Sequence, residues 1–342
     1  MGLQSTGAIS LDDLHVEVGG TSGTTCSLND ADIRALISVG DSANQSIQQY
    51  YGKSSETSLG DSAGSSINGQ VQLQEITASS YISSGGTLRI PSNMWVWSDS
   101  RTTAALTIDI PCTVINDGKI IGKGGEGSSY YNFSASTSAT TGGPAINVTS
   151  SGVTITNSSG AFIAGGGGGG GHRQKGGDPQ DSNSGGGGGA GGGQGGRGWI
   201  SSHSGENAGT ISGVGGVLNA SGGGCYHRQT NSLQSDNGGG AGGASGGTNC
   251  SGGGGGRILP GTGGTWAYAS NPNGYGDGGS AGNTGGRNNP TAGASFHVIA
   301  GGGGGWGASG GQGVNTLGAA GGAAISGTSR TLSNSGTIYG ST

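Results

Sequence analysis

The chain reads GGGGGGGHR over residues 165–173, GGGGGAGGGQGGRGW over 185–199 and GGGGGWGASGGQG over 301–313, and these stretches decide how it can fold. Glycine has no side chain to bury and loses more backbone entropy on ordering than any other residue, so a flexible linker is the default expectation. Two features indicate order instead. Runs of similar length recur, and the inserts between them carry Trp, Tyr and Phe side chains, which disordered segments usually lack. The full series of runs is 165–171, 185–198, 222–224, 238–247, 252–256, 276–286, 301–313 and 318–322.

Glycine runs become ordered when each extends as a left-handed helix with three residues per turn and packs against its neighbours. Such a helix has no internal hydrogen bonds, so its N–H and C=O groups need partners on adjacent segments, and only glycine allows so close an approach. Collagen is excluded, because there is no strict G-X-Y period and the chain has seven prolines. We therefore predict a slab of glycine rods with the inserts as loops at its two ends.

The direction of the rods decides where the inserts emerge. If consecutive rods run in opposite directions, successive inserts emerge at alternate ends of the slab. One end would then gather residues 172–184 with 225–237, and the other would gather 199–212 with 248–251.

These runs resemble the glycine-rich receptor-binding adhesins at the fibre tips of T-even-like bacteriophages. The resemblance rests on residues 165–322, rather less than half of the chain. It implies a lattice of polyglycine II helices whose connecting loops contact the bacterial surface. The predicted fold class is mainly β and irregular, with a short N-terminal docking module that holds one small helix, β-strand repeats, and the polyglycine II lattice with its loops.

The inserts carry planar and amphipathic side chains that suit adaptable recognition. Trp and Tyr stack on sugar faces, and Arg pairs with phosphate or carboxylate groups. We predict that receptor contacts come from His172, Arg173, Trp199, His203, Tyr226, His227, Arg228, Trp266, Tyr268, Tyr275 and His297. The alternative is that these side chains pack over the edges of a slab that has no core of its own.

Residues 1–40 read as a compact module. The stretch SLNDADIRALI, residues 27–37, is typical of a capped short helix with an apolar stripe. Together with GAISLDDLHVE it resembles the N-terminal segment of tail and fibre proteins of many phages, which implies docking onto the virion through Leu11, Leu14, Ile33 and Leu36. The alternative is an ordinary N-terminal cap for the rest of the chain. Residues 41–70, rich in Ser, Gln, Asn and Gly, are expected to form a linker.

From residue 71 to 164 the pattern changes to short strands with Gly, Pro and Ser between them. Three stretches repeat a strand, a turn with Asn and Gly, and a second strand: VINDGKIIG at 114–122, ITNSSGAFIAG at 155–165 and LSNSGTIYG at 332–340. The third copy lies in a C-terminal unit, residues 323–342. We predict that the copies flank the glycine slab and cap its edges, as terminal repeats cap a solenoid. Plain β-hairpins are the alternative.

Charge and motif content exclude several classes of function. The net charge is −5 with no basic cluster, so no nucleic-acid partner is expected, and no apolar stretch reaches the roughly 18 residues of a membrane span. Carboxylates in the inserts are scattered singly, so we predict no enzyme, no cofactor and no metal site. For Cys225 and Cys250 a disulfide and two buried thiols are both open.

The leading hypothesis is a component of the virion tail that is made in the host bacterial cytoplasm. It would dock onto other tail, baseplate or fibre proteins and recognise a bacterial surface receptor, either an outer-membrane protein or a glycan. Its oligomeric state stays open between a monomer and a homotrimer. One alternative is a purely structural tail or baseplate protein, and another is an ice-binding or cell-wall glycine-rich protein.

Overall fold

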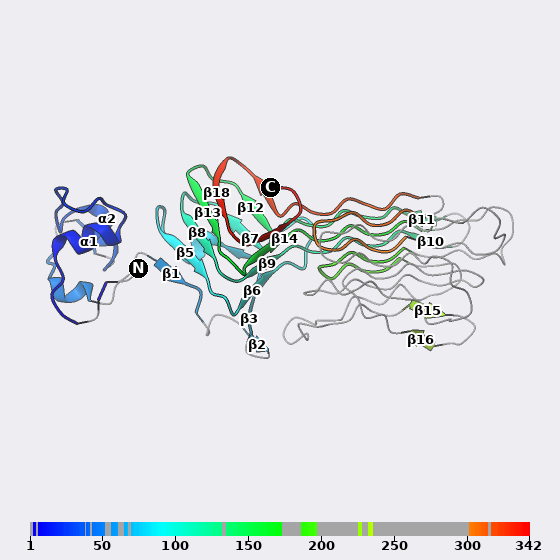
Figure 1. Ribbon diagram of the computed structural model, residues 1–342, viewed down its shortest axis with the longest axis horizontal. Coiled ribbons are helices and arrows are strands. Elements are labelled where there is room, and N and C mark those ends of the chain that lie inside the picture. Colours follow the sequence, from blue (N-terminus) through cyan, green and yellow to red (C-terminus); the bar gives the residue numbers. More distant parts are fainter. Residues whose placement is uncertain are drawn as a thin grey trace.

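The computed structural model describes residues 3–4, 6–37, 39–41, 43–51, 56–60, 65–67, 70–131, 135–172, 186–196, 225–227, 232–234, 301–313 and 316–342. They form three parts along the longest axis of the molecule: an N-terminal unit (residues 3–51), a β-solenoid of three sheets, and a glycine array (Figure 1). The array comprises residues 122–128, 140–143, 165–172, 186–196, 301–313 and 316–322. Most of the described secondary structure is strand in parallel sheets and helices are few, which confirms the prediction of a mainly β chain.

Three short helices build the N-terminal unit: α1 (Leu11–Glu17), α2 (Ala31–Ala35) and the 3-10 helix η1 (Ile47–Tyr50). The first begins at a capping box, in which Asp13 N donates to Ser10 Oγ at 3.1 Å and Ser10 N donates to the Asp13 carboxylate at 2.7 Å. The predicted small helix corresponds to α2, and α1 was not predicted.

Each of these helices contributes one fully buried side chain to the core of the unit, namely Leu14, Ile33 and Tyr50. Two of the predicted attachment residues, Leu14 and Ile33, therefore stabilise the unit itself and have no exposed surface. The other two, Leu11 and Leu36, pack against the same core.

The N-terminal unit extends into the stretch that the sequence predicted to be a linker. Tyr50 lies in the core, and the hydroxyl of Tyr51 donates to the carbonyl of Gly7. Aromatic side chains thus close the unit at residue 51. The first strand of the solenoid follows as β1 (Glu56–Ser58).

The solenoid consists of three sheets, described in their spatial order. The first contains β1, β5 (Thr87–Ile90), β8 (Thr113–Asn116), β13 (Val153–Asn157) and β18 (Arg330–Asn334). The second contains β19 (Thr337–Tyr339), β14 (Phe162–Ala164), β9 (Lys119–Ile121), β6 (Met94–Trp97), β3 (Gln70–Gln74) and β2 (Ser65–Ile67). The third contains β17 (Ile325–Gly327), β12 (Ile146–Val148), β7 (Leu106–Ile108) and β4 (Ile76–Thr77), which leads into the 3-10 helix η2 (Ala78–Ser80).

The chain winds through the sheets in the order third, first, second, and each complete coil contributes one strand to each sheet. Neighbouring coils pair in parallel, so equivalent side chains stack in rows that point into the interior. The three inward rows are Leu88, Val114, Ile155 and Leu332; Val96, Ile120, Ile163 and Ile338; and Ile76, Leu106, Ile146 and Ile325. Each fully buried aliphatic side chain in these rows contributes about 1.5–3 kcal/mol of burial free energy.

The three sequence repeats occupy consecutive coils, but they are not hairpins. The two strands of each repeat lie in different sheets, and each pairs in parallel with the same strand of the next repeat. The hairpin alternative is wrong because stacking identical repeats buries their apolar rows, which a lone hairpin would leave half exposed. Residues 325–339 are the outermost coil of the solenoid, with β17, β18 and β19 at the sheet edges.

An asparagine ladder joins the coils inside the first sheet. Asn116 Nδ2 donates to Asn157 Oδ1 at 2.8 Å, and Asn157 Nδ2 donates to Asn334 Oδ1 at 2.8 Å. Asn116 and Asn157 have no exposed surface. The ladder ends at Ile90, which is in register with Asn116, and Asn116 Oδ1 has no partner among the described residues.

We expect Asn157→Ala to lower the free energy of unfolding by about 2–4 kcal/mol. The change removes both ladder bonds and the bond from Asn157 Nδ2 to the Thr337 carbonyl, and Asn116 Nδ2 keeps only its 3.3 Å bond to the Phe162 carbonyl. Loss of partners by a buried polar group costs about 1–3 kcal/mol. Urea unfolding followed by circular dichroism measures the effect. Asn334→Ala is the matched control, because Asn334 is exposed at the ladder end and accepts one ladder bond. An equal loss in both variants would contradict a stabilising role for the ladder.

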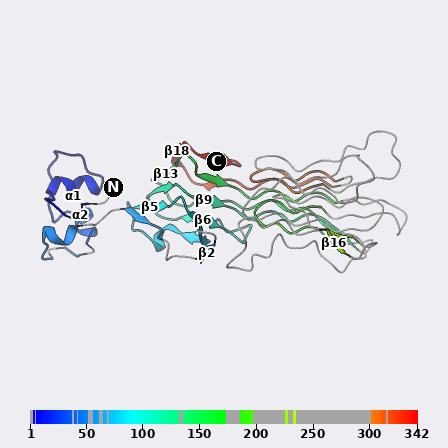
Figure 2. The same ribbon diagram turned by 60° about the horizontal axis from the view of Figure 1, so that its bottom comes forward.

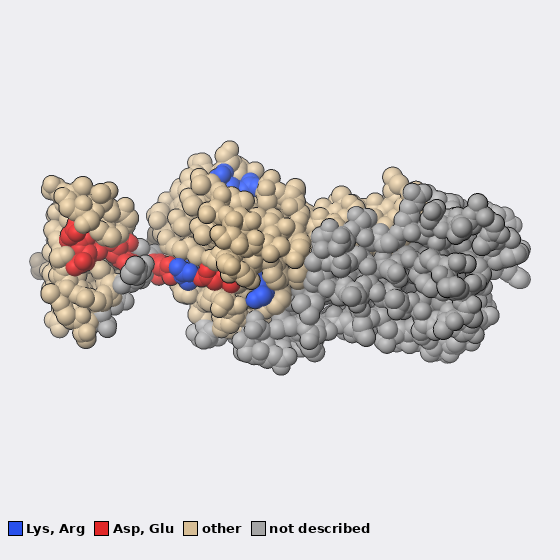
Figure 3. Space-filling model, in the orientation of Figure 1, with Lys and Arg blue, Asp and Glu red and all other residues tan. Residues whose placement is uncertain are grey.

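Charged side chains form a row on the face of the solenoid that Figure 3 shows. The Arg89 guanidinium on β5 donates to the Glu56 carboxylate on β1 through Nε at 2.6 Å and also pairs with Asp117. The hydrogen bond from Arg89 lowers the pKa of the Glu56 carboxyl. This pair fastens the first strand after the N-terminal unit to the solenoid.

The glycine array is held by main-chain hydrogen bonds with a three-residue repeat. In the central segment, residues 165–171, successive N–H groups donate to three neighbouring segments in turn, and every third residue returns to the same neighbour. The donor pairs are Gly166 to Gly143 and Gly169 to Thr140; Gly167 to Ala190 and Gly170 to Gly187; and Gly168 to Ala308 and Gly171 to Gly311.

The carbonyl groups of the central segment follow the same repeat toward three further segments. They accept from Gly322 and Ala319; from Gly125 and Ser128; and from Gly304 and Gly301. All twelve bonds measure between 2.7 and 3.1 Å. Six segments therefore surround the central one, and the main chain takes the place of an apolar core.

An aromatic cluster fixes the array to the solenoid. Trp95, Phe162 and Tyr339 come from β6, β14 and β19, and Trp306 reaches them from a turn of the array. The ring centroids of Phe162 and Trp306 are 4.8 Å apart, and those of Trp306 and Tyr339 are 5.8 Å apart. Trp306 is 3% exposed, so packing over the edge of the slab is its role.

Candidate functional site

The glycine array meets the solenoid at one end, and its opposite end is called the distal end here (Figure 2). Three described segments end at the distal end, at His172, Gly196 and Gly313. Three others begin there, at Gly186, Gly301 and Thr316. Main-chain hydrogen bonds hold this layer together: Gly196 N to Gly186 O at 2.8 Å, Gly301 N to Gly171 O at 2.8 Å and Gly313 N to Thr316 O at 2.9 Å.

A turn inside the run 185–198 explains why Gly186 and Gly196 lie at the same end of the array. The run was predicted as one rod, but it reverses at residues 190–192, where Gly191 and Gly192 have φ angles of +99° and +85°. The run is therefore two rods, and its two ends lie side by side.

A second turn divides the run 301–313, which reverses at residues 306–308 with Gly307 at a φ of +64°. The predicted alternation of inserts between the two ends is therefore wrong for the described segments. The inserts that begin after His172 and after Gly196 leave the array from the same end.

His172 is the predicted receptor-contacting residue whose side chain the structure describes. It is 3% exposed, its Nδ1 lies 3.1 Å from Ser128 Oγ, and its carbonyl accepts from Thr316 Oγ1 at 2.8 Å. Burial lowers the pKa of the His172 ring. At this position the imidazole contributes to packing at the distal end. Leu317, beside Thr316, is 74% exposed there.

Other predicted contact residues fall outside the described residues: Arg173, Trp199, His203, Arg228, Trp266, Tyr268, Tyr275 and His297. Tyr226 and His227 lie in β15 (Cys225–His227), whose backbone pairs antiparallel with β16 (Ser232–Gln234) and whose side chains are not described. The suggested disulfide partner Cys250 also lies outside, whereas Cys26 and Cys112 are free thiols.

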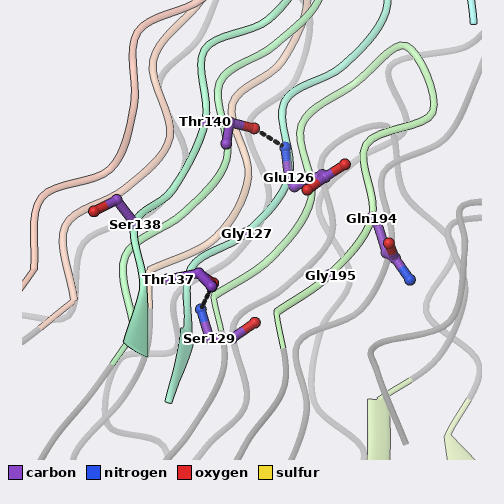
Figure 4. Close-up of a pocket in the computed structure, with 8 residues that line it drawn as sticks. All are labelled: Glu126, Gly127, Ser129, Thr137, Ser138, Thr140, Gln194 and Gly195. Carbon is purple, nitrogen blue, oxygen red and sulfur yellow. Dashed lines mark hydrogen bonds between the residues drawn. The ribbon is translucent and has the colours of Figure 1, made fainter. Parts of the chain in front are cut away.

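A polar pocket of about 320 Å³ opens on the array near the distal end (Figure 4). Its lining comes from segments that the array brings together and from β10 (Ser129–Tyr131) and β11 (Ala135–Thr137), which form an antiparallel pair. The lining residues are Glu126, Gly127, Ser129, Thr137, Ser138, Thr140, Gln194 and Gly195.

Main-chain bonds across the pocket fix its walls. Glu126 and Thr140 are joined twice: Glu126 N donates to Thr140 Oγ1 at 2.7 Å, and Thr140 N donates to Glu126 O at 2.9 Å. Gly127 N donates to the main-chain carbonyl of Gln194 at 2.8 Å. In Figure 4 the side chains of Glu126 and Gln194 project from neighbouring segments.

Sequence reasoning missed the pocket because its residues come from three separate stretches. Glu126 and Gln194 are polar residues with glycine on both sides, in segments where side chains are few. That isolation was the available signal, since a polar side chain among glycines neither fills a core nor favours the extended backbone.

Within the described ranges, no group of three or more His, Cys, Asp or Glu side chains could hold a metal ion. Helices there are also all too short or too polar to cross a bilayer.

Comparison with known proteins gives two matches. Residues 61–248, more than half of the chain, match the family model described as phage tail fibre adhesin Gp38. Among solved structures, the crystal structure of the gp37-gp38 adhesin tip complex of the bacteriophage S16 long tail fiber matches at 19% sequence identity and a TM-score of 0.36, over 98% of this chain and 99% of that one. No curated protein matches the chain.

Proposed function

The chain belongs to the phage tail fibre adhesin Gp38 family, and on that premise we propose that it recognises the bacterial surface through the distal end of its glycine array. It is a component of the virion tail that acts in host attachment. The segments 173–185 and 197–300 would carry the receptor-reading side chains, because they hold every predicted contact residue except His172. The observation that carries this proposal is that both segments begin and end in one hydrogen-bonded layer.

We also propose that the rods of the array are polyglycine II helices. The three-residue repeat of the hydrogen bonds and the six neighbours of residues 165–171 support this, because a helix with three residues per turn and no internal bonds presents its groups in that pattern. A frame of this kind holds the starting points of the inserts before a receptor arrives. Preorganisation reduces the ordering cost of binding.

The N-terminal unit is proposed to dock onto other tail fibre proteins. Its own core and its position at the opposite end of the molecule from the distal end support this role (Figure 1). Leu14 and Ile33 would then act by keeping the unit folded, and the contacts would come from its exposed surface. A catalytic role is not proposed, because attachment requires binding alone.

The experiment that tests the function measures adsorption of the phage in the presence of the full purified chain. We expect saturable binding of the chain to whole host cells and a matching block of phage adsorption. A folded chain that neither binds cells nor blocks adsorption would instead favour a purely structural tail component. Boiled chain serves as the control for nonspecific adsorption.

A further inference from the structure

We propose that the polar pocket lined by Glu126, Thr137, Thr140 and Gln194 is a binding site for a neutral sugar ring. The inference rests on the proposed function only in that the sugar would belong to the host surface. The described lining of the pocket comes from the array and from β10 and β11. It would give the adhesin a subsite built on the rigid frame.

The Glu126 carboxylate is available to a ligand. Among the described residues it is the one Asp or Glu side chain without a hydrogen bond or ion pair. Partners of the others include Ser22 for Asp12, Ser10 for Asp13, Arg34 for Asp41, Arg89 for Glu56 and Asp117, Ser98 for Glu75, Lys123 for Asp99, and Ser79 for Asp109. Asp30 and Asp32 accept from main-chain N–H groups, and Glu17 also has a partner. Glu126 is exposed, so its carboxylate is free to accept hydrogen bonds from a ligand in the pocket.

Two threonine hydroxyl groups are also available to a ligand. Thr140 Oγ1 accepts from Glu126 N at 2.7 Å, and Thr137 Oγ1 accepts from Ser129 N at 3.2 Å. A hydroxyl that accepts in this way still has its own proton to donate. Both threonines therefore offer a fixed donor to the pocket.

The Gln194 side chain adds further hydrogen-bonding groups to the pocket. Its main-chain carbonyl accepts from Gly127, and its side-chain amide has no bond among the described residues, so the amide is left with two donors and an acceptor. The pocket thus combines one strong acceptor with several donors.

The chemistry of this lining selects a neutral polyhydroxylated ligand. A carboxylate accepts from two adjacent hydroxyls of a sugar, while threonine and amide N–H or O–H groups donate to ring and hydroxyl oxygens. A phosphate or carboxylate ligand would meet the Glu126 charge, and the described lining residues include no Lys or Arg to balance it. A calcium ion needs six to eight oxygen ligands and more than one carboxylate. At roughly 30 Å³ per water, 320 Å³ corresponds to about ten waters, which is more than enough room for one pyranose ring.

Saturation-transfer NMR with the full chain tests the inference. The probes are methyl α-D-glucopyranoside, methyl α-D-mannopyranoside, methyl β-D-galactopyranoside and N-acetylglucosamine, each at millimolar concentration. We expect transfer to at least one probe. Glu126→Gln, which keeps the shape of an exposed side chain, should weaken that binding about tenfold, because a charge-assisted hydrogen bond becomes a weaker neutral one.

Asp41→Asn is the matched control, because Asp41 is an exposed carboxylate on the N-terminal unit whose partner is Arg34. Thr140→Val gives a second variant that removes a donor, with the melting temperature as a check of folding. Transfer to none of the four probes, or equal binding by wild type and Glu126→Gln, overturns the subsite. The adsorption assay is independent: a chain that blocks adsorption without binding any probe retains the adhesin function and loses the subsite.

Discussion

Gly168→Ala should destabilise the glycine array by about 3 kcal/mol or more, the upper part of the range for overpacked interiors. A Cβ at this position would lie 1.9 Å from the carbonyl oxygen of Ala319 and 2.6 Å from that of Ala320. Both atoms are main chain and belong to a hydrogen-bonded neighbour, so no flexible side chain can move aside. The array would have to open locally and lose several of the bonds that replace a core.

Thermal melting combined with limited proteolysis measures this loss. The expected result is a lower melting temperature and early cleavage within the array. Gly40→Ala is the matched control, because its φ is not positive and an added Cβ there would meet no atom within 4 Å. If the melting curve of Gly168→Ala overlays that of Gly40→Ala, close main-chain packing is not what orders the array.

Simultaneous replacement of Trp199, Trp266 and Tyr268 by alanine should abolish the block of phage adsorption. Aromatic anchors in binding interfaces commonly cost 2 kcal/mol or more on truncation, so three of them correspond to a loss on the order of a hundredfold or more. The melting temperature should stay that of the wild type, because a frame held by main-chain bonds does not depend on insert side chains.

The readout is the concentration of chain that halves adsorption, measured beside the melting curve. Val16→Ala is the control, since Val16 is an apolar side chain that is 47% exposed on the N-terminal unit. An unchanged half-blocking concentration in the triple variant would mean that recognition does not use these aromatics. A lowered melting temperature would instead assign them to packing.

The family resemblance read from the glycine runs is confirmed by the family match, and the mainly β class is confirmed by the sheets. The direction of the rods could not be predicted from the same runs. A turn within a glycine run has no sequence signal, because glycine adopts the positive φ of Gly191 or Gly307 as readily as the extended backbone beside it.

The repeats around Asn116, Asn157 and Asn334 were also identified from the sequence, but their pairing was not. A strand, turn and strand with Asn and Gly is compatible with a hairpin, and local sequence does not distinguish it from a corner of a solenoid. The difference lies in partners that are 41 and 177 residues away in the sequence, which supply the parallel neighbours. The polar pocket was missed for the same reason, since Glu126, Thr140 and Gln194 meet through long-range contacts.

The outermost coil also constrains the order in which the molecule is completed during translation. Asn157 bonds to Asn334 at a sequence separation of 177 residues, and residues 165–171 bond to segments that precede them and to segments that follow them in the chain. Contacts at such separation form slowly. The N-terminal unit and the first coils can fold on the ribosome, whereas the rods wait until residues 301–322 have been synthesised. In that interval the nascent chain exposes unpaired main chain and few apolar side chains, so chaperones that recognise hydrophobic segments would find little to hold.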